Sequence, residues 1–308
     1  MKRGRGQSMP HKRVAVTGAN GHIGVQLIET LLLRDGVEPV AIVRSDRAAL
    51  ALHQRFGERL RVSVVDYGNA DALRTAFDDA TVCVHLVGII RQTAHSTYED
   101  AHERPCQAIV KAGQSLQHVV YLSILGVGDL HLSNNVCLRS RARAEEILRN
   151  SSIPSSVVRV PMVLGPDDYA SHALAKKALA SVRFEFRPRS LEQPIDSTDV
   201  VAALVKLVVD EPRRMTIELA GSESITRREL VKRAAKAMGR GPGMMIGLPM
   251  WLGYSIAKVL AFLPSPPVTR DMLEILNHDD AIDASSGAET IGISLTPLDE
   301  TLKRVLRR

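Results

Sequence analysis

The sequence has few of the residues that build a disulfide or metal framework. Only three cysteines, Cys83, Cys106 and Cys137, occur in 308 residues, and none has the close CxxC spacing of a zinc site. An odd number of cysteines suits reduced thiols better than a set of disulfides. Histidines and carboxylates around His102 do not supply enough ligands at a defined spacing either. The sequence therefore predicts neither a disulfide framework nor a metal site.

Aromatic residues and targeting signals are also scarce. Aromatics make up 4% of the chain, so Val, Leu, Ile and Ala must form the core. Residues 1–9 lack the apolar segment of a secretory signal, and we therefore expect a cytoplasmic protein. Much of the net charge of +6 comes from basic residues near the two ends, and residues 1–12 are expected to be a disordered basic tail. No nucleic-acid-binding motif accompanies these charges, so no nucleic acid partner is expected.

Short apolar runs alternate with helical patterns through the first half of the chain. The runs at 40–43, 62–65, 82–87 and 119–122 are continuously apolar, as is typical of parallel strands buried on both faces. This alternation predicts a Rossmann-type, doubly wound α/β sheet formed by residues 13–160. Beyond residue 160 the alternation loosens, and residues 161–308 are expected to form a smaller, partly intercalated lobe.

A glycine-rich turn joins the first apolar run to the first helical pattern. Gly18, Gly21 and Gly24 follow Val14-Ala15-Val16 in the order strand, turn, helix. Such a turn allows a sharp exit from the strand, leaves room for phosphates, and lets the helix lie close to the sheet. The free N–H groups and positive dipole at the helix start bind a pyrophosphate. The turn predicts a dinucleotide site, and its remaining contact residues are Asn20, His22 and Ile23.

The residue after the second strand bears on which dinucleotide binds. An acidic residue there would bind the ribose 2′-hydroxyl of NAD, whereas a basic one would accommodate the 2′-phosphate of NADP. Arg44 follows the run ending in Val43, and its planar charged side chain suits a phosphate. We therefore expect NADP(H) in preference to NAD(H), although Asp46 could still serve a ribose hydroxyl.

Together these residues resemble the short-chain dehydrogenase/reductase superfamily, in the extended and atypical branch with the TGxxGxxG signature. The resemblance implies that Asp66 and Tyr67 lie beside the adenine, and that Val87 and Gly88 pack beside the adenine-side ribose. It also places Pro161 beside the nicotinamide, in a stretch similar to the family's Arg-Pro-x-x-x-x-Gly-Pro. Local similarity at 85–90, 165–168 and 248–271 is to the group related to the accessory subunit of respiratory complex I.

The same resemblance implies catalytic positions that this chain has changed. Active members use a Ser after the fifth strand and a Tyr-x-x-x-Lys pair on the next helix, which shares one helix face. Ser123 matches the first position, but Cys137 and Arg141 stand where the family has Tyr and Lys. Arg141 could still contact ribose hydroxyls, while Cys137 is either a packing residue or a weak proton relay. Tyr98 is the other candidate donor, although a surface position is expected for it.

Two functions follow from this pattern. One is a nucleotide-holding protein that acts as a sensor, scaffold or assembly protein; the other is an NADP-dependent reductase or epimerase-like enzyme with a non-standard proton donor. Residues 244–263 are apolar but are interrupted by Pro249 and Lys258, so they are too short to span a membrane. We expect a lid or docking helix there, which could contact a protein partner or a membrane surface.

Overall fold

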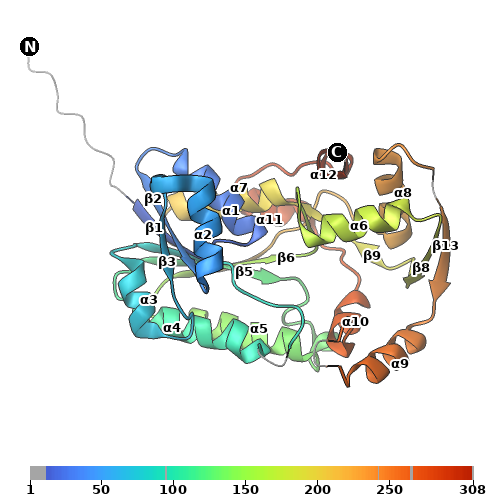
Figure 1. Ribbon diagram of the computed structural model, residues 1–308, viewed down its shortest axis with the longest axis horizontal. Coiled ribbons are helices and arrows are strands. Elements are labelled where there is room, and N and C mark those ends of the chain that lie inside the picture. The colour runs from blue at the N-terminus through green and yellow to red at the C-terminus, as the bar shows by residue number, and fades with distance from the viewer. Residues whose placement is uncertain (1–11, 94–95, 242, 264–265, 307–308) are drawn as a thin grey trace, which may run out of the picture.

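The centre of the molecule is a seven-stranded parallel sheet (Figure 1). The computed structural model describes residues 12–93, 96–241, 243–263 and 266–306, so all of the predicted basic tail except Lys12 lies outside the described residues. The spatial order of the strands is β11 (Met215–Glu218), β6 (Ser155–Val160), β5 (His118–Ile124), β4 (Val82–His85), β1 (Lys12–Thr17), β2 (Val37–Val43) and β3 (Arg61–Val64). The strand order reverses between β1 and β4, which is the doubly wound topology that the sequence predicts.

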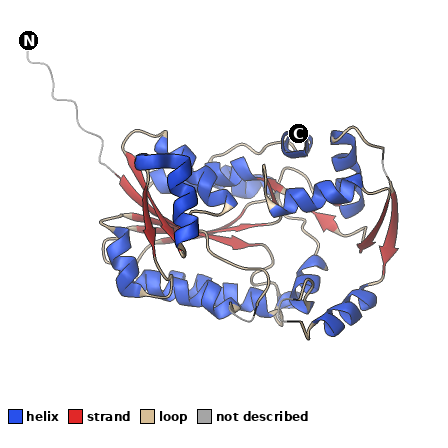
Figure 2. Cartoon of the chain, in the orientation of Figure 1, coloured by secondary structure: helices blue, strands red, loops and turns tan. Residues whose placement is uncertain are grey.

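Helices cover both faces of this sheet, as Figure 2 shows. One apolar cluster joins the sheet to α1 (His22–Leu32), α2 (Asp46–Phe56), α7 (Ser197–Val209) and α11 (Ala284–Ile291). A second cluster joins the other face to α3 (Ala70–Phe77), α4 (Arg104–Ala112) and α5 (Val136–Arg149). Because both faces are covered, the central strands are buried throughout and need the continuous apolar runs seen in the sequence.

The helical region after β4 differs from its prediction. The sequence pattern predicts one helix near residues 98–115, but the structure has a π-helical turn at Glu99–Glu103 followed by α4. Pro105 occupies the first turn of α4, where its missing N–H costs no hydrogen bond. Gly113 ends α4. Short 3-10 turns also occur at Gly57–Arg59 and Leu130–Leu132.

The second half of the chain contributes to two cores. The strand β11 and the helices α7 and α11 pack with the main sheet. Three other helices enclose a separate apolar cluster: α6 (Tyr169–Leu179), α8 (Arg227–Ala237) and α12 (Leu298–Leu306). Thr226 caps α8 by accepting a hydrogen bond from the Glu229 N–H. The division of the chain at residue 160 stays a prediction.

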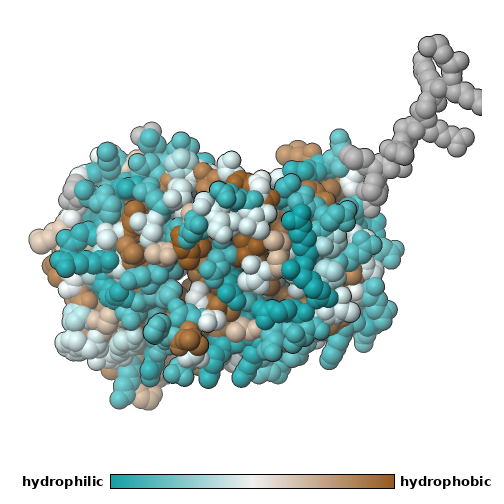
Figure 3. All heavy atoms as spheres, turned by 180° about the vertical axis from the view of Figure 1, so that it is seen from behind, coloured by the Kyte–Doolittle hydropathy of each residue, from teal (hydrophilic) through white to brown (hydrophobic). Residues whose placement is uncertain are grey.

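The smaller lobe also contains three two-stranded ladders and two peripheral helices. The ladders are β7 (Val163–Leu164) with β10 (Ile195–Asp196), β9 (Leu191–Glu192) with β12 (Ile225–Thr226), and β8 (Val182–Phe186) with β13 (Met244–Leu248). The helices are α9 (Met250–Leu260) and α10 (Arg270–Leu276). None of the helices in the described ranges is long and apolar enough to cross a membrane. The rear face of the molecule is largely hydrophilic, with hydrophobic residues gathered near its middle (Figure 3).

Candidate cofactor site

The glycine-rich turn lies at the carboxyl end of β1, where the strand order reverses. Gly18 has a φ of +73°, a left-handed conformation that glycine adopts without strain, and its carbonyl oxygen accepts a hydrogen bond of 2.9 Å from the Gly21 N–H. A Cβ atom on Gly24 would lie 2.5 Å from the same oxygen, so a side chain there would force the turn and α1 apart. The glycines at 18 and 24 therefore let α1 pack against the end of the sheet.

The start of α1 is open to a ligand. No side chain caps this helix, and its first turn carries no acidic residue. Asn20 and Gly21 are exposed at the tip of the turn, and His22 and Ile23, half-buried, begin the helix. The first-turn N–H groups and the positive end of the helix dipole are thus left for an anion. This geometry fits a pyrophosphate.

Tyr67 supports the turn from below. Its hydroxyl accepts a hydrogen bond of 3.0 Å from the Gly18 N–H and donates one of 2.9 Å to the Ile42 carbonyl. Burial raises the pKa of this phenol, although the Gly18 N–H and the Arg44 guanidinium oppose the shift. The Arg44 guanidinium carbon lies 5.8 Å from the centre of the Tyr67 ring, within cation–π range, and Arg44 is exposed. The structure thus brings Gly18, Arg44 and Tyr67 together, whereas the carboxylate of Asp66 is exposed and accepts the Gly68 N–H.

The segment after β4 forms the opposite side of the site. A Cβ atom on Gly18 would lie 3.2 Å from the Leu86 carbonyl carbon, so the glycine turn packs closely against this segment. Val87 is buried, and Gly88 is exposed with the Arg141 guanidinium against its Cα. Arg141 is itself 6% exposed, and among the described residues its buried Nε has no hydrogen-bond partner. The Arg141 guanidinium therefore packs against the exposed backbone at Gly88.

The other two predicted catalytic side chains are engaged in the protein interior. Ser123 donates a hydrogen bond of 2.7 Å to Glu145, which also receives two hydrogen bonds from Arg159, at 3.2 and 2.7 Å. Cys137 is fully buried, with its sulfur 3.7 Å from the Ile89 carbonyl oxygen. Burial raises the pKa of Cys137, and the nearby Arg141 guanidinium opposes this shift without cancelling it. A thiol in this setting is a poor proton relay at neutral pH.

Tyr98 is buried, where the sequence pattern favours a surface position. Its hydroxyl donates a hydrogen bond of 3.2 Å to the Ile90 carbonyl, and its ring stacks on His102. Burial raises the pKa of Tyr98, and the neighbouring Cys137 and Asp271 add to this rise. Burial also lowers the pKa of His102 to about 3, with the Arg141 charge contributing. Both side chains are therefore uncharged near neutral pH.

A set of contacts that the sequence did not predict ties the start of α1 to the smaller lobe. Gln26 lies 2.6 Å from the His22 ring nitrogen Nε2 and accepts a hydrogen bond of 3.0 Å from Ser197. Gly165 packs directly against His22, and Asp168 accepts hydrogen bonds from the Gly165 N–H and the Ser171 hydroxyl. Burial lowers the pKa of His22, and the Asp168 charge opposes this. The Ser197–Gln26 and Gly165–His22 contacts join residues far apart in sequence, so spacing gave no signal for them.

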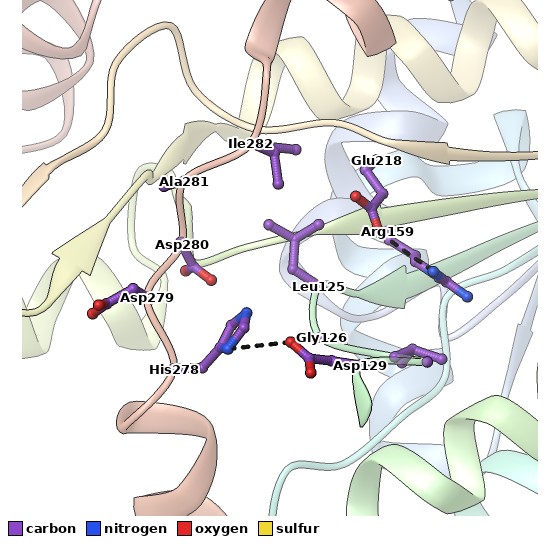
Figure 4. A pocket seen from close by; sticks show the side chains of 12 residues that line it. Leu125, Gly126, Asp129, Arg159, Glu218, His278, Asp279, Asp280, Ala281 and Ile282 are labelled. Carbon is purple, nitrogen blue, oxygen red and sulfur yellow. Dashed lines mark hydrogen bonds and ion pairs between the residues drawn. The ribbon is translucent and has the colours of Figure 1, made fainter. Parts of the chain in front are cut away.

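A cavity of about 440 Å³ lies beyond the carboxyl ends of β5 and β6 (Figure 4). Asp129, Arg159, Glu218, His278 and Asp280 contribute polar groups to its lining. Burial, helped by the nearby Glu192 carboxylate, raises the pKa of Asp280 to about 7. Pro161 follows β6 directly, and the cavity lining does not include it. The cavity is therefore a candidate site for a polar small molecule.

The sequence around His102 predicts no metal site. Across the described ranges, no group of three or more His, Cys, Asp or Glu side chains is arranged to hold a metal ion. His95, which the sequence places near His102, lies outside these ranges. All three cysteines are free thiols and are buried.

Comparison with known proteins identifies what this geometry is similar to. In sequence, the chain is 23% identical to NADH dehydrogenase (ubiquinone) 1 alpha subcomplex subunit 9 of Arabidopsis thaliana mitochondria, over 87% of this chain and 70% of the relative. It is 24% identical to the mitochondrial NADH-ubiquinone oxidoreductase 40 kDa subunit of Neurospora crassa, over 87% of this chain and 71% of that one. These matches confirm the predicted similarity to a complex I subunit.

Solved structures share the fold at low identity. The NADPH-dependent quinone oxidoreductase QOR2 of Escherichia coli, complexed with NADPH, has a TM-score of 0.71 at 21% identity, covering 94% of this chain and 98% of that one. UDP-glucuronic acid 4-epimerase of Bacillus cereus, in complex with UDP-glucuronic acid and NAD, has a TM-score of 0.72 at 19% identity, covering 96% and 98%. At this identity the likeness establishes the fold alone.

A family model matches more than half of the chain. Residues 18–211 match the family described as NAD(P)H-binding. The residues present fit such a cofactor, because Gly24 has no room for a side chain, α1 is uncapped, and Arg44 is exposed above Tyr67. When bound, a nicotinamide cofactor supplies hydride chemistry. The match and the geometry together show that this chain belongs to the NAD(P)H-binding family.

Proposed function

We propose that this protein binds NADP(H) and holds it as part of a sensor, scaffold or assembly role. The proposal rests on the burial of Cys137, the residue that aligns with the superfamily's proton-donating tyrosine. It is fully buried, and burial raises its pKa. A buried neutral thiol that faces a backbone carbonyl is badly placed to exchange a proton with a substrate. We therefore propose that the protein binds NADP(H) but does not carry out the superfamily's usual proton transfer.

The preference for NADP(H) over NAD(H) rests on Arg44. Its exposed guanidinium lies directly after β2 and above the Tyr67 ring, where a charged, planar side chain suits a 2′-phosphate. Asp46 begins α2 and is exposed, so it remains the group that would serve a ribose hydroxyl in NAD(H). Arg141 is proposed to contact ribose hydroxyls through its guanidinium N–H donors.

A second candidate is an NADP-dependent oxidoreductase, either a reductase or epimerase-like, with a non-standard proton donor. The cavity beyond β5 and β6 favours it, since Asp280 has a pKa of about 7 there and could exchange a proton near neutral pH. Under this proposal the donor is Asp280, Tyr98 or Cys137. If the protein only holds the cofactor, as the first proposal states, no reaction takes place in this cavity.

Partner and location are proposed from the relatives. The plant and fungal proteins are named as subunits of mitochondrial NADH dehydrogenase. A respiratory protein partner, and a location beside a membrane, are therefore proposed for this chain. Neither depends on whether it performs hydride transfer.

Thermal unfolding with NADPH, NADP, NADH and NAD tests the first proposal. At about one hundred times its Kd, a ligand stabilises the folded state by about 2.7 kcal/mol, which raises Tm by several degrees. We expect NADPH to give the larger rise, and Arg44→Gln to weaken NADPH binding about tenfold by removing a charged phosphate contact. Arg47→Gln is the matched control, because Arg47 is also exposed but lies in the first turn of α2.

Two results would count against the proposal. Equal stabilisation by NADH and NADPH, unchanged by Arg44→Gln, would remove the preference for NADP(H). Incubation of the NADPH complex with carbonyl and quinone acceptors addresses the second candidate. Oxidation of NADPH that depends on the acceptor would establish the oxidoreductase and exclude a purely cofactor-holding role.

A further inference from the structure

The smaller lobe carries an exposed apolar surface far from the cofactor site. Val182 and Phe184 of β8 pair with Met244 and Ile246 of β13, so all four side chains lie on one face of the ladder. They are exposed by 46%, 63%, 62% and 38%, respectively. In Figure 1, this ladder and α9 follow one another at the right-hand end of the molecule, away from the main sheet.

The helix α9 extends this surface. Gly253 and Ala257 are its buried residues, and Gly253 packs against the Phe186 ring, so one face of α9 is fixed to the lobe. The opposite face exposes Trp251 by 67% and Val259 by 70%, and Phe262, just beyond the helix, is exposed by 91%. Apolar patches of this kind on an otherwise polar protein mark contact sites.

The sequence that includes β13 and α9 is basic. Between Glu229 and Asp271 the sequence contains no Asp or Glu, but it contains six basic residues: Lys232, Arg233, Lys236, Arg240, Lys258 and Arg270. Lys258 lies on the exposed side of α9, and no ion pair holds it among the described residues. The acidic side chains that follow are turned to other partners, since Glu274 accepts hydrogen bonds from Arg270 and Asn135.

A groove runs beside α9 on the same part of the lobe. It has a volume of about 630 Å³, and Ala257, Ala261, Pro266 and Val268 give it an apolar lining. Lys258 and Arg270 also line it; Arg270 pairs with Glu274, so Lys258 supplies the cationic group beside the apolar lining. This combination matches an anionic lipid headgroup with the upper part of its acyl chains.

We propose that α9 and the β8–β13 ladder form a surface that docks on an anionic lipid bilayer. The helix lies in the interface, with Trp251 and Phe262 among the lipids and with Lys258 beside the headgroups. A basic side chain near an anionic leaflet strengthens adsorption, and salt weakens it. The docking requires no bound cofactor, so it is independent of the proposed function.

Trp251 is the chain's only tryptophan, so its fluorescence reports directly on this surface. The purified full chain is mixed with vesicles of phosphatidylcholine alone, or of phosphatidylcholine and phosphatidylglycerol in equal parts. We expect the emission to shift to shorter wavelength, and the protein to sediment with the vesicles, only where phosphatidylglycerol is present. Lys258→Glu is expected to weaken partitioning by about 30-fold.

Two control variants separate local contacts from general effects. Lys111→Glu changes the net charge equally at an exposed position on α4, and it should leave partitioning almost unchanged. Leu33→Asp changes an 84% exposed apolar residue at the end of α1 and should also have little effect, whereas Val259→Asp should abolish the emission shift. Far-ultraviolet circular dichroism confirms that each variant is folded.

Three outcomes would overturn the proposal. The first is an unchanged emission with both kinds of vesicle, and the second is equal binding to both kinds, which would remove the role of charge. The third is a blue emission in the protein alone that shifts red on dilution as a dimer dissociates. That result would assign the surface to a second copy of the chain.

Discussion

The candidate cofactor site has two regions that differ in whether their polar groups are free to contact a ligand. At the glycine turn, the chain keeps Gly18, Gly21 and Gly24, leaves α1 uncapped and exposes Arg44. At the ends of β5 and α5, by contrast, Ser123 is bonded to Glu145 and Cys137 is fully buried. The first region presents free donors to a ligand, whereas in the second Ser123 is bonded to Glu145 and Cys137 faces the Ile89 carbonyl.

This contrast shows why the fold alone does not establish an activity. Dinucleotide binding needs backbone N–H groups and space, and both depend on glycines that the turn retains. Proton transfer needs a side chain of suitable pKa that a substrate can reach. A chain can keep the first and change the second, because different elements provide them.

The largest expected effect tests whether the second region is structural. Glu145 is 1% exposed and binds both Arg159 and Ser123. Glu145→Gln removes the charge that compensates Arg159, and we expect a loss of about 3 kcal/mol in the free energy of unfolding, measured by denaturant titration. Glu146→Gln, at an exposed neighbouring position, should change it by less than about 0.5 kcal/mol. Similar stabilities for the two variants would contradict a structural role for Glu145.

The next effect concerns the glycine turn. Gly24→Ala places a Cβ 2.5 Å from the Gly18 carbonyl oxygen, so the turn must shift, at a cost of about 2 kcal/mol. We also expect the rise in Tm with NADPH to disappear, because the first-turn N–H groups move with α1. Gly241→Ala is the control, since a Cβ there meets no atom within 4 Å. A Gly24→Ala protein that NADPH still stabilises would show that binding does not need this geometry.

Local pattern was enough to predict the fold. Apolar runs predicted the central strands. The sequence pattern also predicts a helix near residues 136–149, which coincides with α5, and Asn135 caps this helix through the Leu138 N–H. The pattern of strand, glycine turn and helix predicted the connection between β1 and α1. Each of these signals depends on residues that are close together in the chain.

Contacts between distant segments could not be predicted in the same way. The β13 strand was missed because a short strand and a helix give the same apolar run, and its pairing with β8 joins residues more than sixty positions apart. The contact of Gly165 with His22 and the hydrogen bond from Ser197 to Gln26 likewise depend on the folded chain. The buried position of Tyr98 was missed because its π-helical turn carries charged residues at Glu99 and Asp100.

The smallest expected effect concerns Asp280, whose pKa is raised from 3.8 to about 7 mainly by burial. Since the folded state favours the protonated carboxyl, ionisation destabilises the protein progressively as pH rises from about 4 to 7. Asp280→Asn removes this cost, but its amide is itself costly to bury, so we expect a net gain of about 1 kcal/mol at pH 8. Tm measured from pH 4 to pH 8 should show the gain appearing only as pH rises.

Asp279→Asn is the matched control for Asp280→Asn, with the opposite sign. Asp279 is exposed, accepts the Leu191 N–H and pairs with Arg187, so its charge is favourable in the folded protein and its removal should lower Tm slightly. A gain for Asp280→Asn that is the same at pH 4 and pH 8 would mean that its carboxyl is not held protonated. In that case the cavity would lose its proton donor, and the contrast between the two regions of the site would become sharper.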